Sequence, residues 1–444
     1  MATQRDREGQ LLDACIRALK LVDSSAYQAE AFASYASSIS AELENGKLKS
    51  SQSGFEGGIG IRVFKEGSMG YAHASLERVE FAVEQAIAAA RAGSPDKGFR
   101  SLPLPERYPS VHGTWDPAIA SVEVASVAQL AMDVADASRV DPRIDTINSG
   151  ASVAQWSEAV ANTLGVSATD SGTMATLDVD VIAHEGRESG NGFEYAASRR
   201  LDLDIDDVGT AAGEMALKSI RPQSIASGKM SIVLDPLAVG AIIAPAVTVS
   251  AEDAQQDRSF MTGKIGEPIA VRDFSIADDG LRPRGLETGP FDAEGVPSQR
   301  TSLVDKGVFQ SYLYDSYTAH KEDRESTGNA SRGDFRQPPT ISSTNLVIAP
   351  GSESSILDDV RRGVYVKATG DRPNMSTGEF SGLVYAGYVI RDGELAHALK
   401  QTNIGISVLD LLKQIDGISR EVKTYFSLTA PTIRVNDVSV ASSG

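Results

Sequence analysis

Two strand-like runs flank a tight turn, Arg-Asp-Gly at 391–393, in the segment YAGYVIRDGELAHAL, residues 385–399. A Gly-containing turn between two such runs is typical of a β-hairpin. The segment 301–314 has the same design around Asp-Lys-Gly at 305–307. Most of the chain after Lys229 is organised in this way, so the sequence predicts a mostly antiparallel, β-rich C-terminal domain.

The N-terminal half alternates helix spacing with strand spacing. Apolar residues that recur at helical intervals predict helices at about 11–22, 79–90, 122–137 and 206–220. Between them, strands are predicted at 39–43, at 57–63 and from 144 to about 203. Asn45-Gly46 predicts a tight turn, and the polar clusters at 170–172 and 188–192 are interpreted as further turns. The predicted fold class is α+β, with N-terminal two-layer α/β domains before the β-rich domain.

Proline positions indicate where the domains divide. Five prolines fall within residues 94–120, which predicts a linker there. The predicted division is an α+β domain at 1–93, a middle α+β domain at 121–222 and a C-terminal domain at 223–444. Within the last, Pro236 is well placed at the first turn of a helix that is predicted to run towards Val249.

Composition excludes several classes of function. The 444 residues carry a formal net charge of −18, which disfavours binding to nucleic acid. Cys15 is the single cysteine, so an internal disulfide and a Cys-rich zinc site are impossible. The polar start does not resemble a signal peptide, and no apolar run approaches the ~18–20 residues needed to cross a bilayer. We therefore expect a cytoplasmic protein without a membrane partner.

Familiar catalytic motifs are incomplete. His184-Glu185 begins like a zincin motif, but Glu188 stands where the second histidine belongs. Gly58-Ile59-Gly60 has no third glycine at dinucleotide-binding spacing, and Gly263-Lys264 lacks the rest of a P-loop. The residues alone therefore indicate an acidic α+β protein and nominate no catalytic group.

A series of short phrases runs through the chain in a fixed order. They are GIRV (60–63), GYA (70–72), FMTGKIG (260–266), IADDG (276–280), FDAEGVP (291–297), QRT (299–301), STGN (326–329), IAPG (348–351), STGEF (376–380) and YVIRDGE (388–394). Each phrase alone is weak evidence, but their order and spacing resemble the TldD/TldE family, also called the PmbA/TldD family. The resemblance covers most of the chain and implies a PmbA/TldD-like fold.

The resemblance also implies a dimeric metallopeptidase that acts on unfolded peptides. In the TldD subunit a helix carries H-E-x-x-x-H, and its two histidines hold zinc together with a cysteine near the C-terminus. The corresponding positions here are Ala244, Pro245 and Val249, and residues 421–427 contain no cysteine. The chain thus resembles the zinc-less TldE/PmbA subunit. No catalytic residue, metal ligand or cofactor is expected in it, and zinc is expected in a TldD-like partner.

Five residues in the family-like phrases are expected to face the dimer cavity and contact peptide. They are Glu294, Arg300, Thr327, Asn329 and Arg332. Hydroxyl, amide and guanidinium groups suit hydrogen bonding to an extended peptide backbone. Tight turns alone would demand similar residues, so a purely structural role remains an alternative.

Three functions stay open from the sequence. The first is a non-catalytic subunit of a TldD/TldE-type heterodimeric metallopeptidase. The second is a stand-alone homodimer that binds peptides or regulates without protease activity, since homologous interfaces can pair like with like. The third is a metal-free hydrolase or a regulator of another enzyme. Formation of a 1:1 complex with a TldD-like chain would separate the first two.

Overall fold

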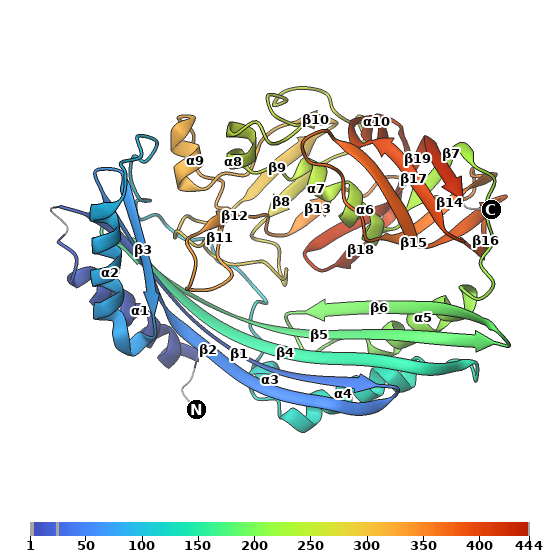
Figure 1. Cartoon of the computed structure of the whole chain (residues 1–444), viewed down its shortest axis with the longest axis horizontal. Helices are drawn as coiled ribbons and strands as arrows, with labels where there is room; N and C mark the ends of the chain where they lie inside the picture. The colour runs from blue at the N-terminus through green and yellow to red at the C-terminus, as the bar shows by residue number, and fades with distance from the viewer. Residues whose placement is uncertain (1–3, 24–25, 443–444) are drawn as a thin grey trace.

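The computed structural model describes residues 4–23 and 26–442. A long, strongly curved β-sheet forms the lower part of the molecule, and a β-rich body lies over its concave side (Figure 1). Helices cover the convex side of the sheet, so the sheet is sandwiched between helices and the C-terminal body (Figure 1).

Six antiparallel strands make up the curved sheet, in the order β3-β2-β1-β4-β5-β6. They are β1 Gln28–Glu44, β2 Lys47–Lys65, β3 Ser68–Ala74, β4 Ile144–Asn162, β5 Ser167–Glu185 and β6 Glu188–Ser198. The predicted Asn45-Gly46 turn joins β1 to β2. Both residues have positive φ, 51° and 69°, as a two-residue hairpin turn with right-handed twist requires.

The sheet consists of two αβββα units joined side by side. The first contains α1 Gln4–Lys20, β1 to β3, the 3-10 turn Leu76–Arg78 and α2 Val79–Ala92. The second contains α4 Val124–Ala137, β4 to β6 and α5 Ile205–Lys218, preceded by the short α3 Pro117–Ala120. Pairing of β1 with β4 joins the units, so the domains predicted at 1–93 and 121–222 share one sheet. The limits of those domains stay a prediction.

Apolar stripes on the helices explain which face they cover. Val79, Val83 and Ala86 of α2 pack with Ile59 and Ile61 of β2 in one core under the first unit. The stripes of α4 and α5 pack in the same way on the inner residues of β4 and β5. Helical spacing therefore located these helices correctly in the sequence.

The two polar clusters that were interpreted as turns lie inside strands. Residues 170–172 belong to β5 and residues 188–192 to β6, and the turns between strands fall at 163–166 and 186–187. Close packing explains the small residues. A Cβ on Gly192 would lie 2.0 Å from the carbonyl oxygen of Ala212, so α5 can approach the strand only over glycine. Tertiary contact, not turn geometry, set this composition.

The C-terminal body is built on an eleven-stranded mixed sheet. Its strands are β7 Gly228–Leu234, β8 Ile276–Asp279, β9 Arg300–Asp305, β10 Val308–Phe309, β13 Leu346–Ile348, β14 Arg362–Thr369, β15 Glu379–Arg391, β16 Glu394–Ala398, β17 Thr402–Ser407, β18 Ile415–Tyr425 and β19 Leu428–Ser442. A small separate pair is formed by β11 Ala330–Ser331 and β12 Thr340–Ile341.

Most of these strands pair antiparallel, as predicted; the parallel pairs are β13–β19 and β14–β7. Both predicted hairpins are present, as β9–β10 and β15–β16. Strand β7 pairs with both β14 and β19, which closes the path β19-β17-β15-β14-β7 into a ring. The α+β class with a mostly antiparallel, β-rich C-terminal domain is confirmed.

The helix predicted from Pro236 to Val249 is broken. It consists of α6 Pro236–Ile242 and the single turn α7 Ala244–Val247. Pro245 has no N–H to donate, and its ring clashes with the carbonyl four residues earlier in a regular helix. The N–H of Ala246 instead reaches back only three residues, to the carbonyl of Ile243 at 3.1 Å.

The remaining helices are short: α8 Ala251–Gln255, α9 Ser316–Lys321 and α10 Val408–Lys413. Ser250 and Asp315 cap the first two by accepting hydrogen bonds from backbone N–H groups three residues on. No helix in the described part of the chain is both long and apolar enough to cross a membrane.

Candidate functional site

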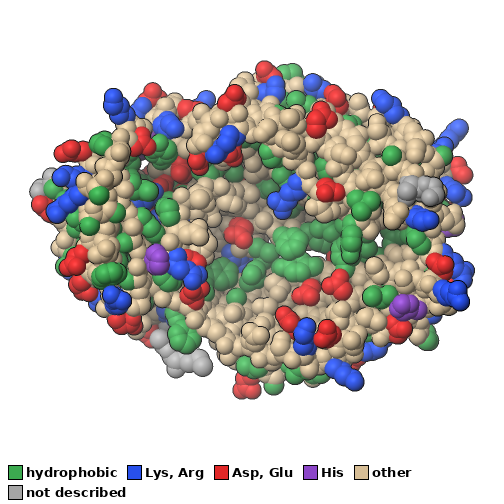
Figure 2. Space-filling model, in the orientation of Figure 1, with side chains coloured by type: hydrophobic (Ala, Val, Ile, Leu, Met, Phe, Trp, Pro, Cys, Tyr) green, Lys and Arg blue, Asp and Glu red, His purple; other side chains and the backbone are tan. Residues whose placement is uncertain are grey.

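A groove of about 790 Å³, which we call the helix groove, runs beside α6 and α7. Gly240, Ala241, Ala244 and Pro245 form its helical wall, and the turn between β18 and β19 forms the opposite wall. The small helical residues leave this space open. In Figure 2 the seam between the curved sheet and the C-terminal body is hollowed, and hydrophobic side chains gather along it.

The three positions that replace the TldD motif do not come together in this groove. Ala244 and Pro245 line it, whereas Val249 is 2% exposed within the C-terminal core. Val249 lies beyond the end of α7, and its carbonyl accepts a hydrogen bond from the N–H of Leu313 at 2.9 Å. Aliphatic side chains have no lone pair for zinc. Among residues 4–23 and 26–442, no group of three or more His, Cys, Asp or Glu side chains could hold a metal ion.

A polar cluster lies at the end of the helix groove, where Tyr425 forms part of the wall. Lys367 donates a hydrogen bond to the Tyr425 hydroxyl at 2.7 Å. The Lys367 ammonium is also 3.5 Å from Asp235 and 3.7 Å from Glu194. The Tyr365 hydroxyl donates to Asp235 at 2.6 Å. Because Glu194 belongs to β6 and the others to the C-terminal body, this cluster ties the two layers together.

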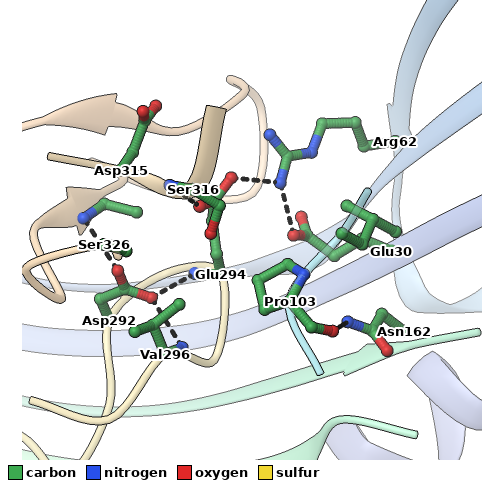
Figure 3. A network of polar contacts seen from close by, with 12 residues as sticks. Glu30, Arg62, Pro103, Asn162, Asp292, Glu294, Val296, Asp315, Ser316 and Ser326 are labelled. Atoms are coloured by element: carbon green, nitrogen blue, oxygen red, sulfur yellow. Dashed lines mark hydrogen bonds and ion pairs between the residues drawn. The ribbon is translucent and has the colours of Figure 1, made fainter. Parts of the chain in front are cut away.

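Four buried charged side chains form a second tie between the layers; Figure 3 shows three of them, Glu30, Arg62 and Glu294. Arg62 Nη2 lies 2.6 Å from Glu30 Oε2 and 2.7 Å from Glu294 Oε1. Arg332 pairs with the other oxygen of Glu30. Each of these side chains is at most 8% exposed. Two guanidinium groups balance two carboxylates, which is the condition for keeping such charges inside a protein. We call this set the buried charge network.

The turn that carries Glu294 is organised by Asp292 (Figure 3). The Asp292 carboxylate accepts hydrogen bonds from the N–H groups of Glu294 at 2.9 Å, Val296 at 3.0 Å and Ala330 at 3.0 Å. Burial, together with the charge of Glu294, raises the pKa of Asp292. Burial alone would raise the pKa of Glu294 as well, but the Arg62 charge and hydrogen bonds outweigh it and lower that pKa.

A second hollow, the interdomain pocket, has a volume of about 420 Å³. Its floor is the concave face of the sheet, and loops 286–298, 328–334 and 342–344 contribute to the opposite side. Strand register places the floor side chains in rows. Ser34 lies opposite Glu158, and Glu158 lies opposite Asp170 on the next strand. Phe32 and Trp156 belong to the rows on either side.

The two acidic side chains on this floor have raised pKa values. Burial, reinforced by the neighbouring Asp170 charge, raises the pKa of Glu158 to about 8. Burial also raises the pKa of Asp170 to about 6. Arg199, which follows β6, stacks on Trp156 with its guanidinium carbon 4.5 Å from a ring centroid, and burial lowers its pKa to about 10. The floor therefore combines a fixed cation with two carboxyl groups that ionise reluctantly.

Glu158→Gln is expected to stabilise the protein in alkali and not in acid. The folded pKa of Glu158 is raised above the unfolded value of about 4.3. Below about pH 4.3 the carboxyl group is protonated in both states and does not lower the free energy of unfolding. As pH rises from there to about 8, ionisation lowers the free energy of unfolding progressively. Thermal melts should show little difference between variant and wild type near about pH 4 and a higher Tm for the variant near about pH 9. A difference that does not change with pH would contradict this, and Glu188→Gln, at an exposed position outside the pocket, is the control.

The residues predicted to face a peptide cavity occupy different places. Asn329 and Arg332 line the interdomain pocket, although Arg332 also belongs to the buried charge network. Glu294 lies inside that network. Thr327 accepts a hydrogen bond from the backbone N–H of residue 314 at 2.8 Å. Arg300 is exposed at the start of β9. Their contact with peptide stays a prediction.

Sequence reasoning missed five charged residues of the buried charge network and of the interdomain pocket. They are Glu30, Arg62, Glu158, Asp170 and Arg199. Arg62, for example, stands between Ile61 and Val63 in a strand-spaced run. This alternation is the ordinary pattern of a strand with one face in solvent, so it did not reveal that Arg62 is buried. The identity of its partner, 232 positions away, could not be inferred from one sequence.

Three domain profiles match this chain in order. The PmbA/TldA metallopeptidase domain 1 matches residues 29–90, the central domain residues 117–220 and the C-terminal domain residues 227–442. Together with the curved sheet under a barrel-like body, these matches define a protein of the metallopeptidase-domain class. The chain belongs to the PmbA/TldD family.

Relatives agree along nearly the whole length. A metalloprotease of Methanothermobacter thermautotrophicus is 29% identical and covers 86% of this chain and 85% of its own length. A metalloprotease PmbA homolog of Haemophilus influenzae is 24% identical and covers 99% of this chain and 98% of its own length. The crystal structure of TldE from Thermococcus kodakarensis matches with a TM-score of 0.89 at 22% identity, covering 98% of this chain and 100% of that one. At this identity the last match shows a shared fold.

Proposed function

We propose that this chain is a zinc-less, TldE-like subunit of a heterodimeric metallopeptidase that degrades or processes unfolded peptides. In this arrangement a TldD-like partner holds the zinc and carries out hydrolysis. The present chain completes the cavity and helps to hold the peptide.

The wall of the helix groove is the observation that carries the proposal. Family membership supplies the metallopeptidase framework. At the positions expected to carry the ligands, this chain has Ala244 and Pro245 on the groove wall and Val249 in the core. Catalytic zinc needs about three protein ligands and one open position for water. This wall offers none of them, yet the groove itself is retained.

The surroundings of the groove favour an extended peptide as the ligand. Phe193 lines the groove, and it belongs to β6, the edge strand of the curved sheet. An edge strand presents backbone groups that can pair with another extended chain. Aromatic pairs border the same seam: Tyr195 stacks on Phe426 at 4.4 Å, and Phe193 lies 5.9 Å from Tyr385. Backbone pairing with apolar contact suits unfolded chains of varied sequence.

We expect the purified chain to contain no stoichiometric zinc and to leave an unfolded peptide uncut. Addition of a TldD-like protein should give a 1:1 complex that cleaves the peptide, and a chelator should abolish the cleavage. Metal analysis, light scattering and a fluorogenic peptide assay measure these three results. The control mixture contains a TldD-like protein whose H-E-x-x-x-H glutamate is replaced by glutamine, so that any cleavage by the present chain would stand out.

Two results would contradict the proposal. Chelator-sensitive cleavage by the isolated chain would show that it forms its own catalytic site. Failure to form a complex, with peptide binding by a homodimer of the chain, would instead favour a stand-alone peptide-binding protein.

A further inference from the structure

The interdomain pocket contains a buried cation that makes no direct ion pair with the described residues. Arg199 is 2% exposed. Its Nε donates to the carbonyl of Gly285 at 3.0 Å, and its Nη2 donates to the carbonyl of Thr288 at 3.2 Å. Nη1 has no hydrogen-bond partner, and no carboxylate of the described residues lies within 4.0 Å of this guanidinium. A buried guanidinium that is held in one orientation and makes no direct ion pair is suited to receive a carboxylate from a ligand.

A glycine on β5 makes room for the Arg199 side chain. A Cβ on Gly172 would lie 2.4 Å from Arg199 Nη1 and 2.3 Å from a ring carbon of Trp156. Only glycine at this position therefore allows the stacked side chains of Arg199 and Trp156 to pack against β5. Arg199 itself lines the pocket, with Nη1 buried and without a partner. The second guanidinium of the pocket, Arg332, has a fully buried side chain whose Nε and Nη1 also lack partners within the described chain.

The two neighbouring carboxyl groups of Glu158 and Asp170 favour a ligand with a positively charged group. Glu158 and Asp170 are register partners on adjacent strands, which places their Cβ atoms roughly 5 Å apart. Neither carboxyl group takes part in an ion pair within the described residues. Two carboxyl groups this close repel each other unless a proton or a cation lies between them. In the free protein a proton on Glu158 meets this condition, and an ammonium group could take its place.

We propose that the interdomain pocket binds a small zwitterion of the amino-acid or dipeptide class, with its carboxylate on Arg199 and its ammonium group at Glu158 and Asp170. A purely anionic ligand such as phosphate would face both carboxyl groups, and a purely cationic ligand would leave Arg199 unneutralised. The volume of about 420 Å³ lies within the range of small-ligand sites. Asn329, which also lines the pocket, has a buried side-chain oxygen that accepts no hydrogen bond within the described residues.

Calorimetry on the isolated full chain tests this proposal, and it does not depend on a catalytic partner. The probes are L-alanyl-L-alanine, its N-acetyl derivative and its C-terminal amide. The free dipeptide should bind. Each blocked form should bind at least about tenfold more weakly, because each loses one charge-assisted contact. Equal binding of all three, or no heat from the free dipeptide at about 10 mM, overturns the proposal.

Variants assign the two ends of the ligand. Glu158→Gln is nearly isosteric and should remove most of the preference for the free amine while keeping the preference for the free carboxylate. Arg199→Gln should do the reverse. Asp178→Asn is the matched control, since Asp178 is an acid of the same sheet, on β5 with Asp170, but lies outside the pocket. If Arg199→Gln fails to fold, the Glu158→Gln comparison alone still decides, because an unchanged amine preference overturns the assignment.

Proton release gives an independent readout. The charged groups that face Glu158 are Asp170 on β5, Arg199, Arg332 and Glu287. Since the Glu158 carboxyl is largely protonated at about pH 7, an ammonium group that binds to it should expel a proton. Calorimetry in two buffers of different ionisation enthalpy should therefore detect release by wild type and loss of that release in Glu158→Gln. Binding of the dipeptide with no proton release in either protein would place the ammonium group elsewhere.

Discussion

Arg62→Leu should lower the free energy of unfolding by about 3–5 kcal/mol, the loss typical of breaking a buried ion pair from one side. The replacement leaves Glu30 and Glu294 as buried carboxylates without their shared partner. Because Glu30 lies on β1 and Glu294 in the C-terminal body, the loss should also loosen the contact between the two layers. Urea unfolding followed by circular dichroism measures the loss.

The loss should depend on pH in a defined direction. The folded pKa of Glu294 is lowered: its burial would raise it, but the charge of Arg62 and the hydrogen bonds prevail. This contribution is therefore fully present above the ordinary glutamate value of about 4.3 and disappears as pH falls through the lower folded pKa. The difference between wild type and Arg62→Leu should shrink correspondingly in acid.

Arg100→Leu provides the matched control for this variant. Arg100 also pairs across the layers, with Asp323, but the two side chains are 52% and 80% exposed. An exposed pair of this kind contributes less than about 1 kcal/mol. If Arg62→Leu costs no more than Arg100→Leu, the buried charge network does not hold the two layers together.

Local signals in the sequence predicted the elements but not their assembly. The turn at Asn45-Gly46 and the hairpin turn at 391–393 depend on neighbours in the chain, so they were correctly located. Strand β1 extends over 28–44, whereas only 39–43 was predicted. Its small polar residues, such as Ser34, face a pocket instead of solvent and blur the expected alternation. The β1–β4 pairing that joins the two αβββα units depends on contacts more than a hundred residues apart.

The sequence also revealed one candidate site and not the other. Ala244 and Pro245 were identified by comparison with a family motif, and they do line the helix groove. The interdomain pocket went unnoticed because its charged residues come from strands and loops far apart in the chain. Glu158 and Arg199, for example, carry no motif, and only the strand register brings the rows of the floor together.

Val249→His should show that the zinc site cannot be restored by replacing residue types. Val249 lies after α7, is 2% exposed and packs within the C-terminal core. A histidine there places a larger, polar ring among apolar neighbours, with an expected loss of about 3 kcal/mol in the free energy of unfolding. Ala244→His is the comparison: Ala244 is also buried, at 5% exposed, but it lines the helix groove, so part of the ring can occupy open space and the loss should be smaller than for Val249→His.

The combined variant Ala244→His/Pro245→Glu/Val249→His should bind no stoichiometric zinc. Two histidines hold a metal only if both project to one point, and here the second position is in the core beyond the end of the helix. Residues 421–427 supply no cysteine as a third ligand. Metal analysis and the unfolding free energy of the triple variant measure the outcome. One zinc per chain would show that Pro245 alone breaks the helix, and that its removal lets α7 continue and turn position 249 towards the groove.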